Sequence, residues 1–221
     1  MKHTILTRCL FLTTGLFAMA LGVAVSTKAN LGIPPISCVP YILHLGLPLS
    51  MGMLTFILNV VFTCLQIVLL RSQFQLIQLF QVVFLGIFGV FMDLALYIVS
   101  LYEVQIESYV FRLVLCLIGI VLIAIGVSMQ VRANLVMLPG DGLVAAIAQV
   151  FKRDFGKVKV GLDVIFVLSA VFLSYFMLHS IEGVREGTVV AALLVGMIVR
   201  FILAKLPVLN TSSVNQSAIV K

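Results

Sequence analysis

The sequence predicts an all-α transmembrane protein in which six spanning helices form two inverted three-helix repeats. Hydrophobic residues make up 62% of the 221 residues and charged residues only 10%, a balance that excludes an ordinary soluble domain. The chain also repeats itself, because a shift of 104 positions aligns residues 20–35 with residues 124–139 without a gap. With an odd number of spans in each copy, the second copy enters the membrane from the opposite face, which makes the repeat inverted.

The first repeat comprises residues 1–100 and the second residues 109–206. Apolar runs at 10–26, 51–70 and 76–99 in the first repeat correspond to runs at 109–130, 158–178 and 187–206 in the second. A helix rises 1.5 Å per residue, so about 20 residues cross a hydrocarbon core of about 30 Å. Each run is therefore predicted to span the membrane, and residues 207–221 are predicted to form a polar tail. The aligned positions that carry most weight are Arg8/Arg112, Gly15/Gly119, Gly22/Gly126, Asn30/Asn134, Pro35/Pro139 and Gly52/Gly156.

Two further apolar stretches, one in each repeat, are interrupted by proline and glycine. The interruptions are Pro34, Pro35, Pro40 and Pro48 in the first stretch, and Pro139, Gly140 and Gly142 in the second. Proline removes a backbone donor and clashes with the preceding turn, so neither stretch is expected to be one continuous spanning helix. We expect a bend followed by a short helix in each, at 36–47 and 142–151, either re-entrant or lying at the membrane interface.

The distribution of charge indicates the topology. With six spans and a cytoplasmic N-terminus, most Lys and Arg residues fall in the cytoplasm, as the positive-inside rule requires, and the C-terminus is cytoplasmic too. The net charge of +6 is explained by this topology, so no nucleic-acid partner is expected. The expected partner is the lipid bilayer.

The paired breaks are the best indication of a binding site. Non-helical backbone inside the bilayer is tolerated only where it is buried against other parts of the protein or lines a cavity. Asn30 and Pro35 mark the first break, and Asn134 and Pro139 mark the second. The two asparagines cap the short helices or turn their amides toward a ligand. Asp141, beside the second break, either binds a cation or proton or is the N-cap of a helix beginning at 142.

Charges well inside predicted spans are functional candidates, because they are costly in lipid. These charges are Asp93, Asp163 and Arg200. Asp163 and Arg200 lie at similar depths from the inner ends of their spans, which predicts a buried pair between them. Asn59, which aligns with Asp163, is predicted to face Asp93 in the outer half of the membrane. The alternative is that such pairs only lock helices together.

No motif in the sequence indicates catalysis. There is no Ser/His/Asp arrangement, HExxH, P-loop or dinucleotide-binding glycine pattern, and the four cysteines form no CxxC. We therefore expect no enzyme activity, no catalytic residues, no metal site and no cofactor.

Three segments resemble a known family. The first span of each half ends in G-V-x-x-x-x-K/R-A-N-L followed by proline, the second break reads PGDGL, and the last span reads EGTVVAALLVGMIVRFI. Together they resemble the YczE/YyaS/YitT family of bacterial integral membrane proteins, over about residues 8–206. Val136, Met137 and Glu186 depart from the small residues of that pattern. The resemblance implies a multi-pass protein of the bacterial inner membrane.

Three functions fit these features. The inverted repeat, the paired breaks and the buried acids favour a small secondary transporter or permease for an unknown small solute or ion. One alternative is a substrate-binding subunit that works with an energy-coupling ATPase. The other is a non-transporting partner that assembles or stabilises another membrane protein, and a homo-oligomer is compatible with each function.

Overall fold

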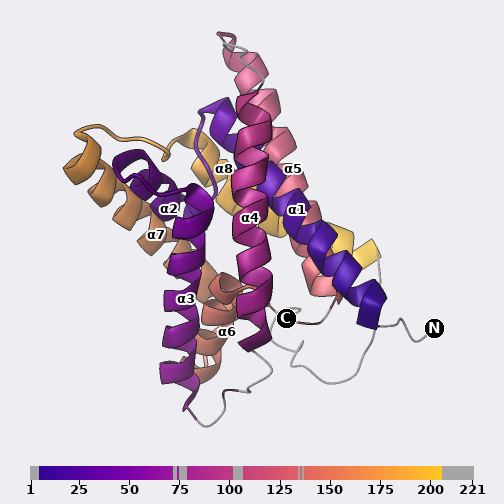
Figure 1. Ribbon diagram of the computed structural model, residues 1–221. Helices are drawn as coiled ribbons and strands as arrows, with labels where there is room; N and C mark the ends of the chain where they lie inside the picture. Colours follow the sequence, from indigo (N-terminus) through magenta and orange to yellow (C-terminus); the bar gives the residue numbers. More distant parts are fainter. Residues whose placement is uncertain are drawn as a thin grey trace.

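The computed structural model describes residues 5–71, 74, 79–101, 107–133, 135 and 137–205. Within this part of the chain the fold is entirely helical, and Figure 1 shows how the helices are arranged. Six helices are long and apolar enough to cross a membrane, as predicted. The eight helices are α1 (Ile5–Ala29), α2 (Pro35–Gly46), α3 (Met51–Leu70), α4 (Phe80–Ser100), α5 (Tyr109–Ala133), α6 (Pro139–Phe151), α7 (Phe155–Leu178) and α8 (Glu186–Lys205).

The helix ends differ from the predicted ones where a cap or a proline decides them. Both short helices carry proline at their first position, Pro35 in α2 and Pro139 in α6. Proline suits this position, because its ring presets the helical φ and the missing N–H would have no partner there. Helix α6 therefore begins three residues before the predicted start at 142. The predicted polar tail, 207–221, lies outside the described residues.

Helices α1 and α5 form the central seam of the molecule, and Figure 1 shows them running side by side. A Cβ atom placed on Gly22 would lie 2.7 Å from the Gly119 carbonyl oxygen, and one on Gly15 would lie 2.9 Å from the Gly126 carbonyl oxygen. The order of these contacts makes the two helices antiparallel. Small residues permit such close backbone approach, which is how helices pack in the absence of a hydrophobic driving force.

The other contacts come in matching sets. Helix α1 packs on α4, and α5 packs on α8. Helix α2 packs on α7, and α6 packs on α3, so each short helix contacts the half of the chain to which it does not belong. One set is incomplete, because α3 packs on α4 whereas α7 and α8 make no comparable contact.

Candidate functional site

A row of polar side chains runs down the buried face of α3. Thr55, Asn59, Thr63 and Gln66 are all nearly inaccessible to solvent. The Asn59 amide donates to the Thr55 carbonyl at 2.8 Å, and the Thr63 hydroxyl donates to the Asn59 carbonyl at 3.0 Å. Gln81 of α4 donates to the Thr63 hydroxyl at 3.2 Å. The spacing of about four residues puts this row on one side of the helix, a signal that the sequence already contained.

The first turns of the two short helices meet beside this row. The Ile36 side chain of α2 occupies the place that a Cβ atom on Gly140 of α6 would need, and the Asn59 amide oxygen lies 4.0 Å from that place. Gln66 donates to the Pro139 carbonyl at 2.9 Å, so α3 supplies a partner to the backbone at the second break. Sequence reasoning missed Gln66, although a glutamine inside an apolar span is the same kind of signal as Asn59.

The second break carries a cluster of three charges. The Lys159 ammonium of α7 lies 2.8 Å from an Asp163 carboxylate oxygen and 4.0 Å from an Asp141 oxygen. The side chain of Asp163 is 12% exposed, and those of Lys159 and Asp141 are 31% exposed. Two carboxylates thus share one cation next to the first turn of α6, where the helix dipole also favours a negative charge.

The predicted pairing of Asp163 with Arg200 is wrong. Asp163 pairs with Lys159, one turn away on the same face of α7, and Arg200 is exposed rather than buried. The prediction compared depths between different helices and overlooked the cation four residues before Asp163, which is close enough to pair.

The predicted contact of Asn59 with Asp93 is also wrong. The Asn59 amide donates to its own helix, while Asp93 of α4 binds the N-terminus of α3. Asp93 accepts hydrogen bonds from the Ser50 hydroxyl at 2.6 Å and from the Gly52 backbone N–H at 2.7 Å. A carboxylate is stabilised at a helix N-terminus, so Asp93 fixes α3 against α4.

For Asn30 and Asp141 the structure contradicts the capping alternative of the prediction. Asn30 follows the end of α1 with φ of 52°, and its carbonyl accepts from the Arg185 guanidinium at 3.1 Å. Asparagine tolerates this left-handed conformation, so Asn30 terminates α1 and does not cap α2. Asp141 lies inside the first turn of α6, and Leu138 occupies the N-cap position. Asn134 lies outside the described residues.

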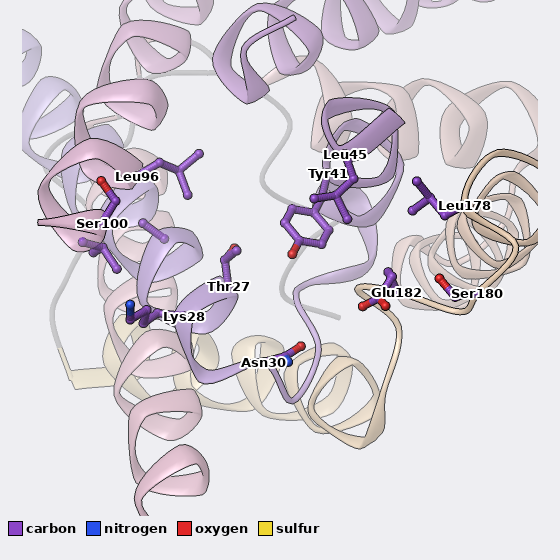
Figure 2. Close-up of a pocket in the computed structure, with 12 residues that line it drawn as sticks. Thr27, Lys28, Asn30, Tyr41, Leu45, Leu96, Ser100, Leu178, Ser180 and Glu182 are labelled. Carbon is purple, nitrogen blue, oxygen red and sulfur yellow. The ribbon is translucent and has the colours of Figure 1, made fainter. Parts of the chain in front are cut away.

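A cavity of about 710 Å³ opens where α1 and α4 end. Figure 2 shows its polar groups: Lys28 and Glu182 lie on opposite sides, and the Tyr41 hydroxyl points into the space between them. Tyr41 belongs to α2, outside the six long helices. Burial raises the pKa of the Tyr41 hydroxyl, and the Glu182 carboxylate raises it further, so this group stays protonated and able to donate. The lining residues are Ala24, Thr27, Lys28, Asn30, Tyr41, Leu45, Leu96, Val99, Ser100, Leu178, Ser180 and Glu182.

Comparison with known proteins confirms the resemblance seen in the sequence. Residues 6–204 match the model of a family of unknown function, DUF6198. The chain is 29% identical to the uncharacterized membrane protein YczE of Bacillus subtilis, over 100% of this chain and 97% of that protein. It is also 34% identical to an uncharacterized protein of Haemophilus influenzae, over 43% of this chain and 42% of that protein. No solved structure matches the chain. The chain is therefore a multi-pass membrane protein that belongs to the DUF6198 family and is similar to YczE.

Proposed function

We propose that this protein is a small secondary transporter of the bacterial inner membrane, built as two inverted repeats, with both termini in the cytoplasm. The observation that carries this proposal is the reciprocity of the α1–α5 seam. Gly15 faces Gly126 and Gly22 faces Gly119, while in the repeat Gly15 aligns with Gly119 and Gly22 with Gly126. Each of these contacts therefore recurs between the repeat counterparts of its two residues, with the two helices exchanged. Reciprocal contacts of this kind are the signature of a two-fold axis.

The orientation of that axis supports the inverted arrangement. It is perpendicular to two antiparallel helices that are each long enough to cross the membrane, so it lies in the membrane plane. The crossed packing of α2 on α7 and of α6 on α3 obeys the same axis. Transporters of this build place their substrate and ion sites near the middle of the membrane, where irregular segments of the two repeats meet.

The polar groups around the breaks support a site of that kind. The first turns of α2 and α6 meet near the middle of α3, flanked by Asn59 and Gln66. The cluster of Asp141, Lys159 and Asp163 lies on the α6 and α7 side. We propose that this cluster couples transport to a proton or cation, because displacing the lysine from one carboxylate leaves a negative charge that such an ion neutralises.

The incomplete contact set supports alternating access. The α3–α4 contact has no extended counterpart between α7 and α8, so the two halves adopt different packings of related sequences. In the proposed cycle the halves exchange these packings: α7 closes on α8 as α3 parts from α4. Rocking of one repeat against the other then exposes the site to each side of the membrane in turn.

A partner role is the second candidate, and the outward faces of α7 and α8 favour it. These faces expose large side chains, including Phe172, Tyr175 and Phe176 on α7 and Leu193 and Phe201 on α8. They fit lipid, a second copy of the chain or a partner membrane protein. Binding of an energy-coupling ATPase to this protein would use such a surface as well.

Proteoliposome uptake tests the transport proposal. Radiolabelled amino acids, sugars, organic acids and monovalent ions are offered to vesicles with an imposed proton or sodium gradient. At least one compound is expected to accumulate, and Asp163→Asn is expected to abolish the gradient-driven part. Asp154→Asn, which changes an exposed carboxylate at the start of α7, is the matched control and retains uptake. Uptake by no compound, or equal uptake by both variants, contradicts the proposal.

Labelling of single cysteines tests the inverted repeat separately. In a cysteine-free background, cysteines at Glu107 and Glu182 should react with a membrane-impermeant maleimide from outside intact cells. A cysteine at Arg153 should react only after the cells are opened. Labelling of the cysteines at Glu107 and Arg153 from the same side of the membrane would exclude the inverted arrangement whatever the uptake assay gives.

A further inference from the structure

We propose that the ion coupled to transport is a proton and that Lys159 determines this choice, because its ammonium group occupies the place beside Asp141 and Asp163 that a metal cation would take. This inference rests on the proposed function and names the coupling ion at the same site. Ionisable side chains inside membrane proteins commonly serve as proton relays. Here the cation and both acids come from the second half of the chain.

The two carboxylates are close enough to share one cation. The Lys159 ammonium nitrogen is 2.8 Å from an Asp163 oxygen and 4.0 Å from an Asp141 oxygen, so these oxygens are separated by no more than the sum of the two distances. Lys159 and Asp163 lie one turn apart on α7. A tethered partner does not lose the translational freedom that a free ion loses on binding. A free cation would have to displace this ammonium or be repelled by it.

The charge of the cluster fits one proton. With both acids ionised, two negative charges share one positive charge, which leaves one net negative charge. A proton on either carboxylate neutralises the cluster, and the Lys159 ammonium keeps the other carboxylate as its partner. A metal cation also needs further oxygen ligands around it, whereas an ammonium group supplies only hydrogen-bond donors. The cluster therefore accepts a proton where it refuses sodium.

The helices packed against α7 leave the charge of the cluster to its own three members. These helices are α6 and α2. Asp141 is the titratable residue of α6, and from α2 the Cys38 thiol lies near enough to Asp163 for their charges to interact. Burial raises the pKa of that thiol to about 12, so it stays neutral. Of the other titratable groups of α2, Tyr41 lines the cavity at the ends of α1 and α4, and His44 binds a backbone carbonyl.

The repeat supports treating the three charges as one unit. At the shift of 104 positions they align with uncharged polar residues, namely Ser37, Thr55 and Asn59. The first half thus lacks the lysine together with both acids. Of the two equivalent places, one offers only neutral hydrogen-bonding groups and the other carries a charge that a proton neutralises. Coupling at one of the two places predicts one proton per transport cycle.

Thermal unfolding tests the exclusion of metal cations without a transport assay. The purified full-length protein is heated at about pH 8.5 in NaCl, LiCl or KCl and, at the same ionic strength, in choline chloride. The wild type should melt at the same temperature in all of these salts. In Lys159→Met the place beside the two carboxylates is free for an ion and its water ligands. At about ten times Kd, NaCl should therefore raise the melting temperature of this variant by about 3–6 °C over choline chloride.

Matched variants connect the effect to the cluster. Lys157→Met removes an exposed lysine of the same helix and should stay insensitive to sodium. Lys159→Met combined with Asp163→Asn removes one carboxylate as well and should lose most of the response. Lys159→Thr introduces the residue found at the equivalent position of the first half, and it replaces the methionine variant if that variant does not fold.

The outcomes separate this inference from the proposed function. Equal stabilisation of the wild type and of the Lys159 variants by sodium overturns the inference, and so does no stabilisation in any Lys159 variant that folds. In proteoliposomes, a proton gradient without sodium should drive uptake, and a sodium gradient at equal pH should not. Uptake driven by sodium alone overturns the inference and leaves the transport proposal standing. Uptake of no compound removes the transport proposal, and the melting experiments then still decide whether Lys159 excludes metal cations.

Discussion

The α1–α5 seam predicts that alanine at Gly22 is costly although alanine is the better helix former. The new Cβ atom would lie 2.7 Å from the Gly119 carbonyl oxygen and from the Ile123 side chain, and 2.8 Å from the Ile123 backbone nitrogen. Carbon contacts are optimal at about 3.5–4.0 Å, so α5 must recede by roughly 0.8 Å. Overpacking of this kind costs about 1–3 kcal/mol. Since the partner atoms include backbone, no side-chain rotation relieves it.

The matched control is Gly196→Ala in α8, where no atom beyond the adjacent backbone of α8 itself lies within 4 Å of the added Cβ. Both variants gain the helix preference of alanine over glycine, about 1 kcal/mol, which cancels in the comparison. The difference between them is therefore the overpacking term alone. At about 2–4 °C per kcal/mol, Gly22→Ala should melt roughly 2–12 °C below Gly196→Ala.

A thiol-reactive fluorescent maleimide suits the measurement, because the chain has no tryptophan and buries Cys38 and Cys116. Heating in detergent exposes both thiols as the helices separate. The exposed Cys64 is replaced by alanine to lower the background. Equal melting temperatures for Gly22→Ala and Gly196→Ala would refute the close approach of the two helices and, with it, the reciprocity on which the two-fold axis depends.

Three further predictions use the same preparation. Lys159→Met should destabilise the protein by about 3–5 kcal/mol, because a buried carboxylate loses its partner, whereas Lys157→Met should stay within about 0.5 kcal/mol of wild type in the same melting assay. Asp93→Leu removes both hydrogen bonds to the start of α3 and should lower the free energy of unfolding by about 1–3 kcal/mol, measured by melting. A wild-type melting temperature would contradict the role of Asp93 in holding the start of α3. A shift of 104 positions aligns Ser50 with Asp154, and a shift of 107 aligns Asp93 with Arg200. Cysteines replacing Asp154 and Arg200 should therefore crosslink in membranes if the halves exchange packings. No crosslink, with or without ligand and gradient, would argue against the exchange.

The sequence predicted what depends on hydropathy and on small residues. Six runs of about 20 apolar residues became the six long helices, since length and composition suffice to identify a span. The glycines that align in the repeat, spaced by seven residues in α1 and in α5, form the seam. Proline at 35 and 139 located the short helices to within a few residues.

Side-chain partners were beyond sequence reasoning where they depend on packing between distant helices. Nothing local to Asp93 indicates that its partner is the start of α3, because that contact exists only through the close approach of Gly52 to Gly89. The crossing of α2 onto α7 likewise has no local signal. The Lys159–Asp163 pair, in contrast, was readable from the four-residue spacing.

The pairing of α1 with α5 also dictates an order of assembly. Gly15 of α1 and its repeat counterpart Gly119 of α5 are 104 positions apart in the chain. Helix α1 therefore emerges from the ribosome well before α5, the helix that covers its glycine face. At about 5–20 residues per second, that interval is roughly 5–20 s. During it, the face that later receives the backbone of α5 meets lipid or the insertion machinery. The interval is longer still for α2, because its packing partner α7 is synthesised after α5. The first half is thus inserted well before it is packed, and the nascent protein acquires its interior only as the second half arrives.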